Sequence, residues 1–185
     1  MSGLHPLSPT EVDARAAAVE LLVLDVDGVL TDGGILMDDD GRELKRFHVR
    51  DGHGIKLLQH YGVPVAVITG RTSGVVAKRA EELGIAYVYQ GYRRKEPAFQ
   101  ALLEQVNVAA AAVAMVGDDV VDLPIMVQAG LTVTVPNAHS LVRRRAHWCT
   151  HSAGGHGAVR EVTDRLLRAK GLEERILADY LTPGS

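Results

Sequence analysis

The chain has 185 residues, of which 46% are hydrophobic and 23% are charged, a composition typical of a folded globular protein and not of a disordered or fibrous one. Twenty Lys and Arg residues against 23 Asp and Glu residues give a net charge of -3, so the chain offers no bulk electrostatic attraction to nucleic acid or to an anionic membrane. The longest apolar run, Val108–Val116, is about half of the ~18 to 20 residues that a membrane-spanning helix needs. We therefore expect no nucleic-acid partner and no membrane partner.

Two features favour the cytoplasm. Residues 1–10 carry no basic segment followed by an apolar stretch, which is the pattern of a secretory signal. The single cysteine, Cys149, has no partner for an internal disulfide, as is usual in a reducing compartment. Because no repeat or linker interrupts the chain, we expect residues 1–185 to form a single domain.

Short apolar runs alternate with amphipathic segments, which predicts an α/β fold with a doubly wound, mostly parallel Rossmann-like sheet. The first helix is expected to begin at Ser8, because Ser8-Pro9-Thr10-Glu11 offers an N-cap, a proline at the first helical position and a capping Glu. Runs that are apolar on successive residues are expected to be strands buried on both faces. The expected strands are 21–24, 63–69, 87–89, 112–116 and 131–135, and the expected helices are 54–60, 74–83, 96–106, 122–129 and 157–170.

The segment 34–49 differs from this alternation. Ile35-Leu36-Met37 precede the turn-forming residues 38–41, and a second extended stretch follows. This pattern predicts a β-hairpin that protrudes from the sheet. At the other end of the chain, the tail 171–185 carries an apolar stripe at helical spacing that is expected to dock on a neighbouring surface.

Three of the expected strands end in polar residues suited to phosphate chemistry. The carboxyl ends of the strands in a doubly wound sheet share one crevice, so these residues are expected to converge. Carboxylates gathered there repel one another and are the hard oxygen ligands that suit Mg²⁺. A single Asp more commonly caps a helix or turn, but the whole set favours a site. The set comprises Asp25, Asp27, Asp118, Asp119 and Asp122, together with Thr69 and Lys95.

Four motifs resemble the haloacid dehalogenase superfamily, in the order in which that family has them. Residues 25–32 (DVDGVLTD) resemble its first motif, residues 68–71 (ITGR) its second, Lys95 its third and residues 117–122 (GDDVVD) its fourth. The stretches 47–55, 89–91 and 153–162 resemble, more narrowly, phosphatases of 3-deoxy sugar acids within the superfamily. This resemblance covers residues 21–171 and implies a hydrolase of small phosphate esters.

The resemblance also implies roles for individual residues. Asp25 is expected to be the nucleophile and Asp27 the general acid and base. Thr69 is expected to bind the phosphoryl oxygens, and Lys95 to offset their charge during transfer. Asp122 is expected to orient Lys95. The expected Mg²⁺ ligands are the Asp25 carboxylate, the Asp27 backbone carbonyl and Asp118, with Asp119 close behind or acting through water.

Substrate contacts are expected from Arg50 and Arg71, because a guanidinium makes bidentate bonds to a carboxylate or a phosphate, and from Gly70 and His156. The resemblance implies an eight-carbon sugar acid 8-phosphate, used to supply a lipopolysaccharide sugar. Two departures leave a nine-carbon 9-phosphate open. Arg94 precedes Lys95 where the family often has a small polar residue or Asp, and His156 stands where it often has Arg.

The motif spacing leaves no room for the cap domain that covers the site in larger members. Forty-one residues separate Asp27 from Thr69, and 25 separate Thr69 from Lys95, whereas a domain needs ~50 or more. An open site is unfavourable for phosphoryl transfer. The resemblance implies a homotetramer in which the hairpins join and neighbouring subunits complete the site, and in which the tail reaches a neighbouring site. A surface hairpin on a monomer is the alternative.

Other classes stay open at this point. A signalling receiver domain also combines Mg²⁺ with an acceptor Asp, a Thr and a Lys, but in receivers the acidic pair comes first and the acceptor Asp later. A scaffold without catalytic activity would not need both Asp25 and Asp27. A phosphomutase would have to retain a sugar bisphosphate, which is difficult without a cap.

Overall fold

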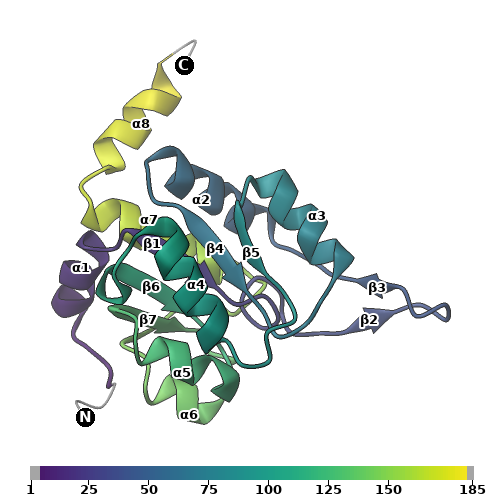
Figure 1. The fold of residues 1–185 in the computed structure, drawn as a ribbon. Coiled ribbons are helices and arrows are strands. Elements are labelled where there is room, and N and C mark those ends of the chain that lie inside the picture. The colour runs from purple at the N-terminus through teal and green to yellow at the C-terminus, as the bar shows by residue number, and fades with distance from the viewer. Residues whose placement is uncertain (1–4, 183–185) are drawn as a thin grey trace.

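The computed structural model describes residues 5–182 and contains a six-stranded sheet in the order β5-β4-β1-β6-β7-β8, with every neighbouring pair parallel (Figure 1). The predicted doubly wound sheet is confirmed. The sixth strand, β8, was not predicted, because two residues are too short to leave an apolar run. The strands are β1 (Leu21–Leu24), β4 (Val65–Ile68), β5 (Tyr87–Tyr89), β6 (Val113–Val116), β7 (Leu131–Thr134) and β8 (Trp148–Cys149).

Helices cover both faces of the sheet, and successive residues of a buried strand point into opposite layers. In β1, Leu22 and Leu24 pack into one apolar core, whereas Leu21 and Val23 pack into the other. The first core is closed by α1 (Pro9–Ala17), α2 (Val49–His60), α3 (Gly74–Leu83) and α7 (Ala158–Ala169). The second is closed by α4 (Glu96–Val106), α5 (Leu123–Met126) and α6 (Ser140–Arg143).

The expected bounds of α3, α4 and β5 are confirmed, and Ser8 caps α1 through a reciprocal pairing with Glu11. Two expectations were wrong. Helix α2 begins at Val49 and not at residue 54, since Gly52 and Gly54 lie inside the helix and give side chains of α3 and α7 the space that a Cβ would fill. The helix expected at 122–129 is a 3-10 turn, Val120–Asp122, followed by the short α5.

The predicted hairpin is confirmed as β2 (Leu36–Met37) and β3 (Glu43–Leu44), an antiparallel pair that projects away from the body (Figure 1). It is shorter than the expected segment 34–49, because α2 already begins at Val49. Asp38 Oδ1 closes its tip by accepting from the backbone N–H of Asp40 and Arg42 at 3.1 and 2.8 Å. Among the described residues, no further domain is inserted between the strands, as expected of a capless fold.

The tail forms α8 (Glu173–Leu181), which extends away from the sheet (Figure 1). Its apolar stripe is divided in two. Ile176 packs against the core of its own chain, whereas Leu177, Tyr180 and Leu181 are exposed. Residues 183–185 of the predicted tail lie outside the described residues. Within residues 5–182, no helix has the length and hydropathy needed to cross a membrane.

Candidate active site

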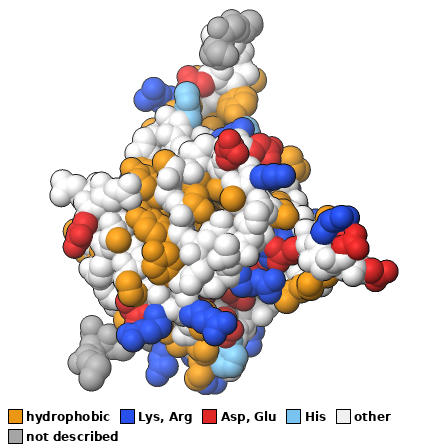
Figure 2. Space-filling model, turned by 45° about the vertical axis from the view of Figure 1, so that its right-hand side comes forward, with side chains coloured by type: hydrophobic (Ala, Val, Ile, Leu, Met, Phe, Trp, Pro, Cys, Tyr) orange, Lys and Arg blue, Asp and Glu red, His pale blue; other side chains and the backbone are white. Residues whose placement is uncertain are grey.

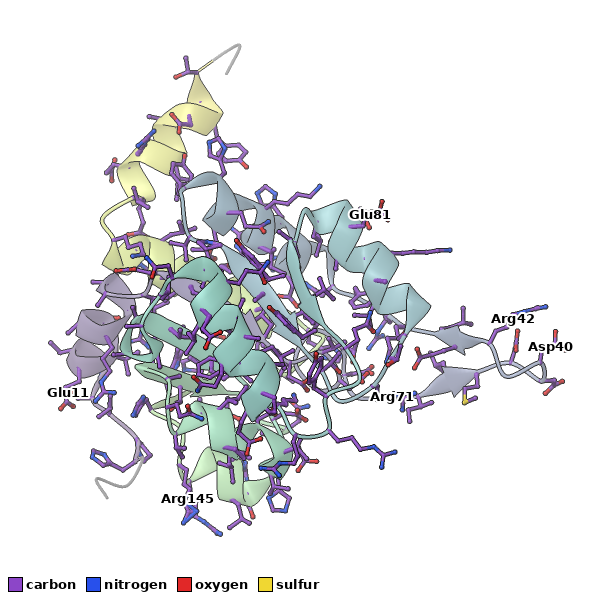
Figure 3. The ribbon with its side chains drawn as sticks, in the orientation of Figure 1. Glu11, Asp40, Arg42, Arg71, Glu81 and Arg145 are labelled. Atoms are coloured by element: carbon purple, nitrogen blue, oxygen red, sulfur yellow. The ribbon has the colours of Figure 1, made fainter. Side chains whose placement is uncertain are left out.

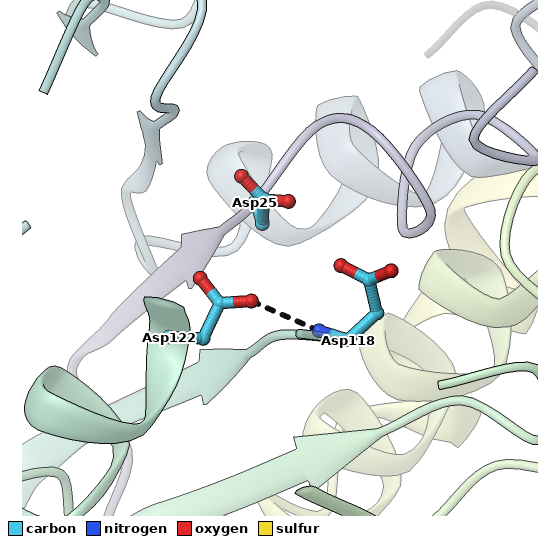
Figure 4. Close-up of side chains that lie close together, drawn as sticks. All are labelled: Asp25, Asp118 and Asp122. Atoms are coloured by element: carbon cyan, nitrogen blue, oxygen red, sulfur yellow. Dashed lines mark hydrogen bonds between the residues drawn. The ribbon is translucent and has the colours of Figure 1, made fainter. Parts of the chain in front are cut away.

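The floor of the site lies where β1 and β6 end. Asp25 follows β1 directly, and its N–H donates to the carbonyl oxygen of Val116 at 3.0 Å, which extends the sheet pairing. Asp118 follows β6 after one glycine. Carboxylate oxygens of Asp25, Asp118 and Asp122 lie within 4.8 Å of one another (Figure 4). The predicted convergence is therefore present for the ends of β1 and β6.

Lys95 joins this cluster from the N-terminus of α4. Its ammonium donates to Asp25 Oδ1 at 2.6 Å and to Asp122 Oδ1 at 2.5 Å. Its side chain is only 1% exposed, so Lys95 is not a solvated surface charge. Burial lowers the pKa of Lys95, but the carboxylates of Asp25 and Asp122 outweigh that effect and the pKa is raised, which keeps the ammonium charged.

Asp122 organises the loop after β6. Its Oδ2 accepts from the backbone N–H of Asp118 at 3.0 Å, drawn in Figure 4, and from that of Asp119 at 3.2 Å. A Cβ on Gly117 would overlap the Asp122 side chain, so that position requires glycine. These contacts fit the expected orienting role of Asp122 on Lys95. The Asp119 side chain is exposed and accepts from Val120 N–H at 2.7 Å, outside the carboxylate cluster.

The cluster carries more negative charge than Lys95 offsets. Burial, followed by the charge of Asp122, raises the pKa of Asp25 from 3.8 to about 6. Burial, followed by the charge of Asp25, raises the pKa of Asp118 from 3.8 to about 7. The raised pKa values show that the crowded carboxylates repel one another when ionised, and a divalent cation that prefers oxygen ligands would relieve this repulsion. The donor set therefore fits Mg²⁺, for which Asp25 and Asp118 would offer carboxylate oxygens.

The turn after β1 is shaped to leave room for Asp118. Gly28 has a φ of +90°, a conformation that favours glycine, and a Cβ there would overlap the Asp118 carboxylate. Gly154 and Gly155 pack on the same turn, where Gly155 N–H donates to the carbonyl oxygen of Val29 at 3.0 Å. A Cβ on either glycine would meet backbone atoms of residues 28–32. The stretch 153–162 thus supports the motif that carries Asp25.

Asp27 lies beneath the hairpin and is held by it. Lys45, immediately after β3, forms an ion pair with Asp27 Oδ1 and lies 3.2 Å from the Glu43 carboxylate. Arg71 donates to Glu43 at 2.8 Å, and its Nε lies 3.8 Å from Asp27 Oδ2. Ser73 Oγ also donates to Glu43. Sequence reasoning missed Lys45 and Glu43, although their spacing around Leu44 would place both on one face of a strand.

Thr69 is buried at the end of β4. Its N–H donates to the carbonyl oxygen of Tyr89 at 2.9 Å, and its Oγ1 accepts from Arg71 N–H at 3.4 Å. Thr69 therefore continues the strand, and Ser73 is the residue that precedes α3. A Cβ added to Gly70 would lie 3.8 Å from its nearest neighbour, the carbonyl oxygen of Tyr92, which is an ordinary contact. Steric crowding therefore does not require glycine at this position.

The remaining predicted substrate residues, Arg50 and His156, make no hydrogen bond or ion pair with Asp25, Asp118 or Asp122 within residues 5–182. Arg50 is exposed in the first turn of α2, and its guanidinium makes no hydrogen bond within residues 5–182. His156 Nε2 accepts from the Arg46 guanidinium at 3.2 Å, and Arg46 pairs with Asp32 at 2.8 Å. His156 therefore lies at the base of the hairpin. Figure 3 places Arg71 between the body and the hairpin, whose tip carries Asp40 and Arg42.

Comparison with known proteins agrees with this geometry. Residues 51–130 match the model of the haloacid dehalogenase-like hydrolases. Over 166 residues the chain is 51% identical to 3-deoxy-D-manno-octulosonate 8-phosphate phosphatase KdsC of Salmonella typhimurium, covering 90% of this chain and 88% of that one. It is 50% identical over 161 residues to KdsC of Escherichia coli, covering 87% and 86%.

Solved structures agree as well. The 3-deoxy-D-manno-octulosonate 8-phosphate phosphatase of Yersinia pestis superposes with a TM-score of 0.87 at 46% identity, covering 89% of each chain. That of Moraxella catarrhalis, in complex with a magnesium ion, a phosphate ion and a KDO molecule, superposes with a TM-score of 0.91 at 36% identity, covering 94% of this chain and 99% of that one.

Fold and site together define a haloacid dehalogenase-like hydrolase in which Asp25 directly follows the central strand. Within that class, identity near 50% over almost the whole chain is decisive. The chain belongs to the family of 3-deoxy-D-manno-octulosonate 8-phosphate phosphatases.

Proposed function

We propose that the protein is a Mg²⁺-dependent phosphatase that hydrolyses 3-deoxy-D-manno-octulosonate 8-phosphate to the free sugar acid and phosphate. The observation that carries the proposal is the buried Asp25, which lies at the end of β1 with one oxygen bound to Lys95 and with Asp118 beside it. This is a nucleophile placed next to a cation-binding carboxylate. The identity to KdsC proteins supports the substrate.

In the first half-reaction, an Asp25 carboxylate oxygen attacks the phosphorus atom. The bond from phosphorus to the sugar oxygen breaks, and the Asp27 carboxyl group gives its proton to that oxygen, so the neutral alcohol leaves. Lys95 neutralises negative charge beside Asp25, at 2.6 Å. Thr69, at the end of the neighbouring strand, offers its hydroxyl group to the phosphoryl oxygens.

In the second half-reaction, Asp27 accepts a proton from water as the water oxygen attacks the phosphorus atom of the aspartyl-phosphate. The bond to Asp25 breaks, phosphate leaves, and Asp27 is protonated for the next cycle. Asp25, the Asp27 carbonyl and Asp118 would hold Mg²⁺, with Asp119 behind them. The ion supplies positive charge that offsets the charge of the phosphoryl group and of the carboxylates.

We further propose that residues 1–185 act as one domain in the cytoplasm and assemble as a homotetramer through the hairpin. Ile35, Leu36, Met37 and Leu44 are each more than half exposed. Figure 2 shows hydrophobic side chains on the projecting hairpin next to charged ones. Exposed apolar side chains gathered on one projection are typical of a surface that another subunit covers. Without a cap, such a subunit would also close the site.

A nine-carbon sugar acid 9-phosphate is the second candidate substrate. Its support is the position of His156, which lies with Arg46 at the base of the hairpin, together with Arg94 before Lys95. Arg94 is exposed and pairs only at 3.7 Å with Glu96, so it is available to an anionic substrate group. Either substrate would use the same carboxylates and the same chemistry.

The deciding experiment is phosphate release from the eight-carbon 8-phosphate, a nine-carbon 9-phosphate and hexose phosphates, each with Mg²⁺ and with a chelator. Metal-dependent turnover that prefers the eight-carbon acid is the expected result. Preference for the nine-carbon acid would keep the mechanism and change the substrate. Absence of turnover on every ester would contradict the proposal and favour the receiver or scaffold alternatives.

A further inference from the structure

Lys45 is the hairpin residue whose surroundings differ most from those of the rest of the hairpin. Leu44, its neighbour in sequence, is 62% exposed, whereas the Lys45 side chain is 1% exposed. The burial of a lysine is unfavourable unless its ammonium is paired. Here the ammonium lies between the carboxylates of Asp27 and Glu43. None of the roles given above to the strand-end residues uses this lysine.

We propose that Lys45 is a positioning residue that holds the Asp27 carboxylate in the orientation needed for proton transfer. The inference rests on the proposed function, in which Asp27 is the general acid and base. Lys45 engages Asp27 Oδ1, which leaves Oδ2 for the ester oxygen and later for water. Proton transfer requires the two heavy atoms to lie about 2.6–3.2 Å apart, so an acid free to rotate would be less effective.

Lys45 is itself fixed by a chain of contacts. Its ammonium lies 3.2 Å from Glu43, and Glu43 accepts from Arg71 at 2.8 Å and from Ser73 Oγ. The side chains in this series of contacts alternate between negative and positive charge, and their net charge is zero. They are Asp27, Lys45, Glu43 and Arg71. Because the Lys45 ammonium also contacts Glu43, the positive charge of Lys45 is divided between two carboxylates and does not act on Asp27 alone.

This chain also links two parts of the molecule. Glu43 and Lys45 come from the hairpin, Asp27 follows the central strand, and Ser73 precedes α3. A displacement of the hairpin would therefore displace the group that orients Asp27. We infer that the hairpin contributes to the chemical step as well as covering the site.

The test compares Lys45→Met with the conservative Lys45→Arg and with the control Lys78→Met, an exposed lysine of α3. We expect Lys45→Met to lower kcat for the eight-carbon sugar phosphate by about 10- to 100-fold, with KM changed by less than about 3-fold, since the loss falls on orientation and not on binding. Lys45→Arg should recover part of kcat, and Lys78→Met should match the unaltered protein.

Two readouts separate orientation of Asp27 from a general structural role. The first is p-nitrophenyl phosphate, compared with the sugar phosphate in single-turnover release of the alcohol, which measures the first half-reaction alone. The leaving group of p-nitrophenyl phosphate needs little protonation, so the Lys45→Met loss should shrink to about 3-fold or less on this ester. The second is the Asp27→Asn background, in which Lys45→Met should cause no further loss, because residues acting as a unit are not additive. Equal losses on both esters, or additive losses in the double variant, would overturn the proposal.

A second variant keeps the test decisive if Lys45→Met does not fold, and turnover by the unaltered protein tests the proposed function itself. If Lys45→Met does not fold, Glu43→Gln keeps Lys45 but loosens it and should show the same pattern with a smaller loss. A Glu43→Gln loss that is equal on both esters would overturn the proposal. Turnover of the sugar phosphate by the unaltered protein reports on the proposed function separately. An unaltered protein that hydrolyses neither ester would contradict that function, and the Lys45 inference with it.

Discussion

The strand-end site and the hairpin are built in opposite ways. Asp25 directly follows the central strand β1, Lys95 precedes the first residue of α4, and the Lys95 ammonium is hydrogen-bonded to two carboxylates. The hairpin has only two residue pairs in register, Leu36 with Leu44 and Met37 with Glu43, and projects from the body. The comparison teaches that the strand-end carboxylates and Lys95 are placed by the sheet and its helices, whereas the hairpin is placed by a few ion pairs.

The hairpin contacts explain how so small an element keeps its position. An isolated two-stranded hairpin is at best marginally stable in water. This one is joined to the body through Glu43 with Arg71, Arg46 with Asp32, and Lys45 with Asp27. Apart from the pair of the buried Lys45, these ion pairs are partly or largely exposed, and exposed ion pairs contribute only about 0–1 kcal/mol each. We therefore expect substitutions on the exposed hairpin surface to change the free energy of unfolding only slightly. Substitutions at the strand ends should strongly lower either the free energy of unfolding or the activity.

The largest expected effect is on activity at the strand-end site. Asp25→Asn should lower phosphate release by about 10³-fold or more, since it removes the proposed nucleophile and one proposed metal ligand. The thermal denaturation midpoint should be retained or raised, because burial and Asp122 already disfavour the ionised form of Asp25 and raise its pKa to about 6. Steady-state assays and thermal melts check both parts. Retained turnover would exclude Asp25 as the nucleophile.

The second effect is on stability. Lys95→Met leaves the buried carboxylates of Asp25 and Asp122 without their cation and should cost about 3–5 kcal/mol in the free energy of unfolding, measured by urea denaturation. The matched control Lys78→Met should stay within about 0.5 kcal/mol. Adding Asp122→Asn to Lys95→Met should restore part of the loss. A fully stable Lys95→Met variant would show that the cluster is not dependent on this pair.

The third effect is a dependence of metal stabilisation on pH. The pKa of Asp118 is raised from 3.8 to about 7, so between these values the folded protein binds more protons than the unfolded chain. Without metal, the free energy of unfolding therefore receives a contribution that decreases as pH rises through this range and is fully lost above it. Mg²⁺ offsets the repulsion, so the melting shift that it produces should be larger at pH 8 than at pH 5.5.

Melts with Mg²⁺ and with chelator are compared at the same pH. This comparison cancels the contributions to stability of titratable groups outside the cluster, such as His147. Burial lowers the pKa of His147 from 6.5 to about 4, so its contribution to stability decreases as pH falls through that interval, the opposite sign. The control variant Asp118→Asn should lose most of the Mg²⁺-dependent shift at pH 8. A shift that is equal at both pH values would argue against the raised pKa.

The smallest effect is expected at the hairpin surface. Leu36 and Leu44 lie opposite each other, so the double variant Leu36→Ser, Leu44→Ser makes one apolar face polar. We expect the assembly to dissociate in light-scattering measurements and KM to rise by about 3- to 10-fold, with little change in the melting midpoint of the subunit. Leu177→Ser on α8 is the control. An intact tetramer, or a monomer with normal KM, would contradict assembly through the hairpin.

Sequence reasoning predicted the central part of the fold well, because β1, β4 and β6 are apolar on every residue and are followed within two residues by Asp or Thr. The bounds of β5, α3 and α4 agree with their prediction. It failed where tertiary packing decides the local structure. Helix α2 contains Gly52 and Gly54, which are typical of a turn, but here they lie inside the helix because Arg79 and Thr163 occupy the space that their side chains would fill. Strand β8 is defined only by its pairing with β7.

The order of Asp25, Asp27, Thr69, Lys95 and Asp118 along the chain was enough to predict a metal and phosphate site at the strand ends, since the carboxyl ends of parallel strands meet at one edge. The resemblance of their motifs to the haloacid dehalogenase superfamily then implied the class of chemistry. Only the tertiary structure decided that Lys45 of the hairpin lies against Asp27 and that His156 lies against Arg46. The physical reason is that ion pairs between distant segments depend on where the hairpin projects. That direction is set by packing across the whole molecule and leaves no local pattern in the residues.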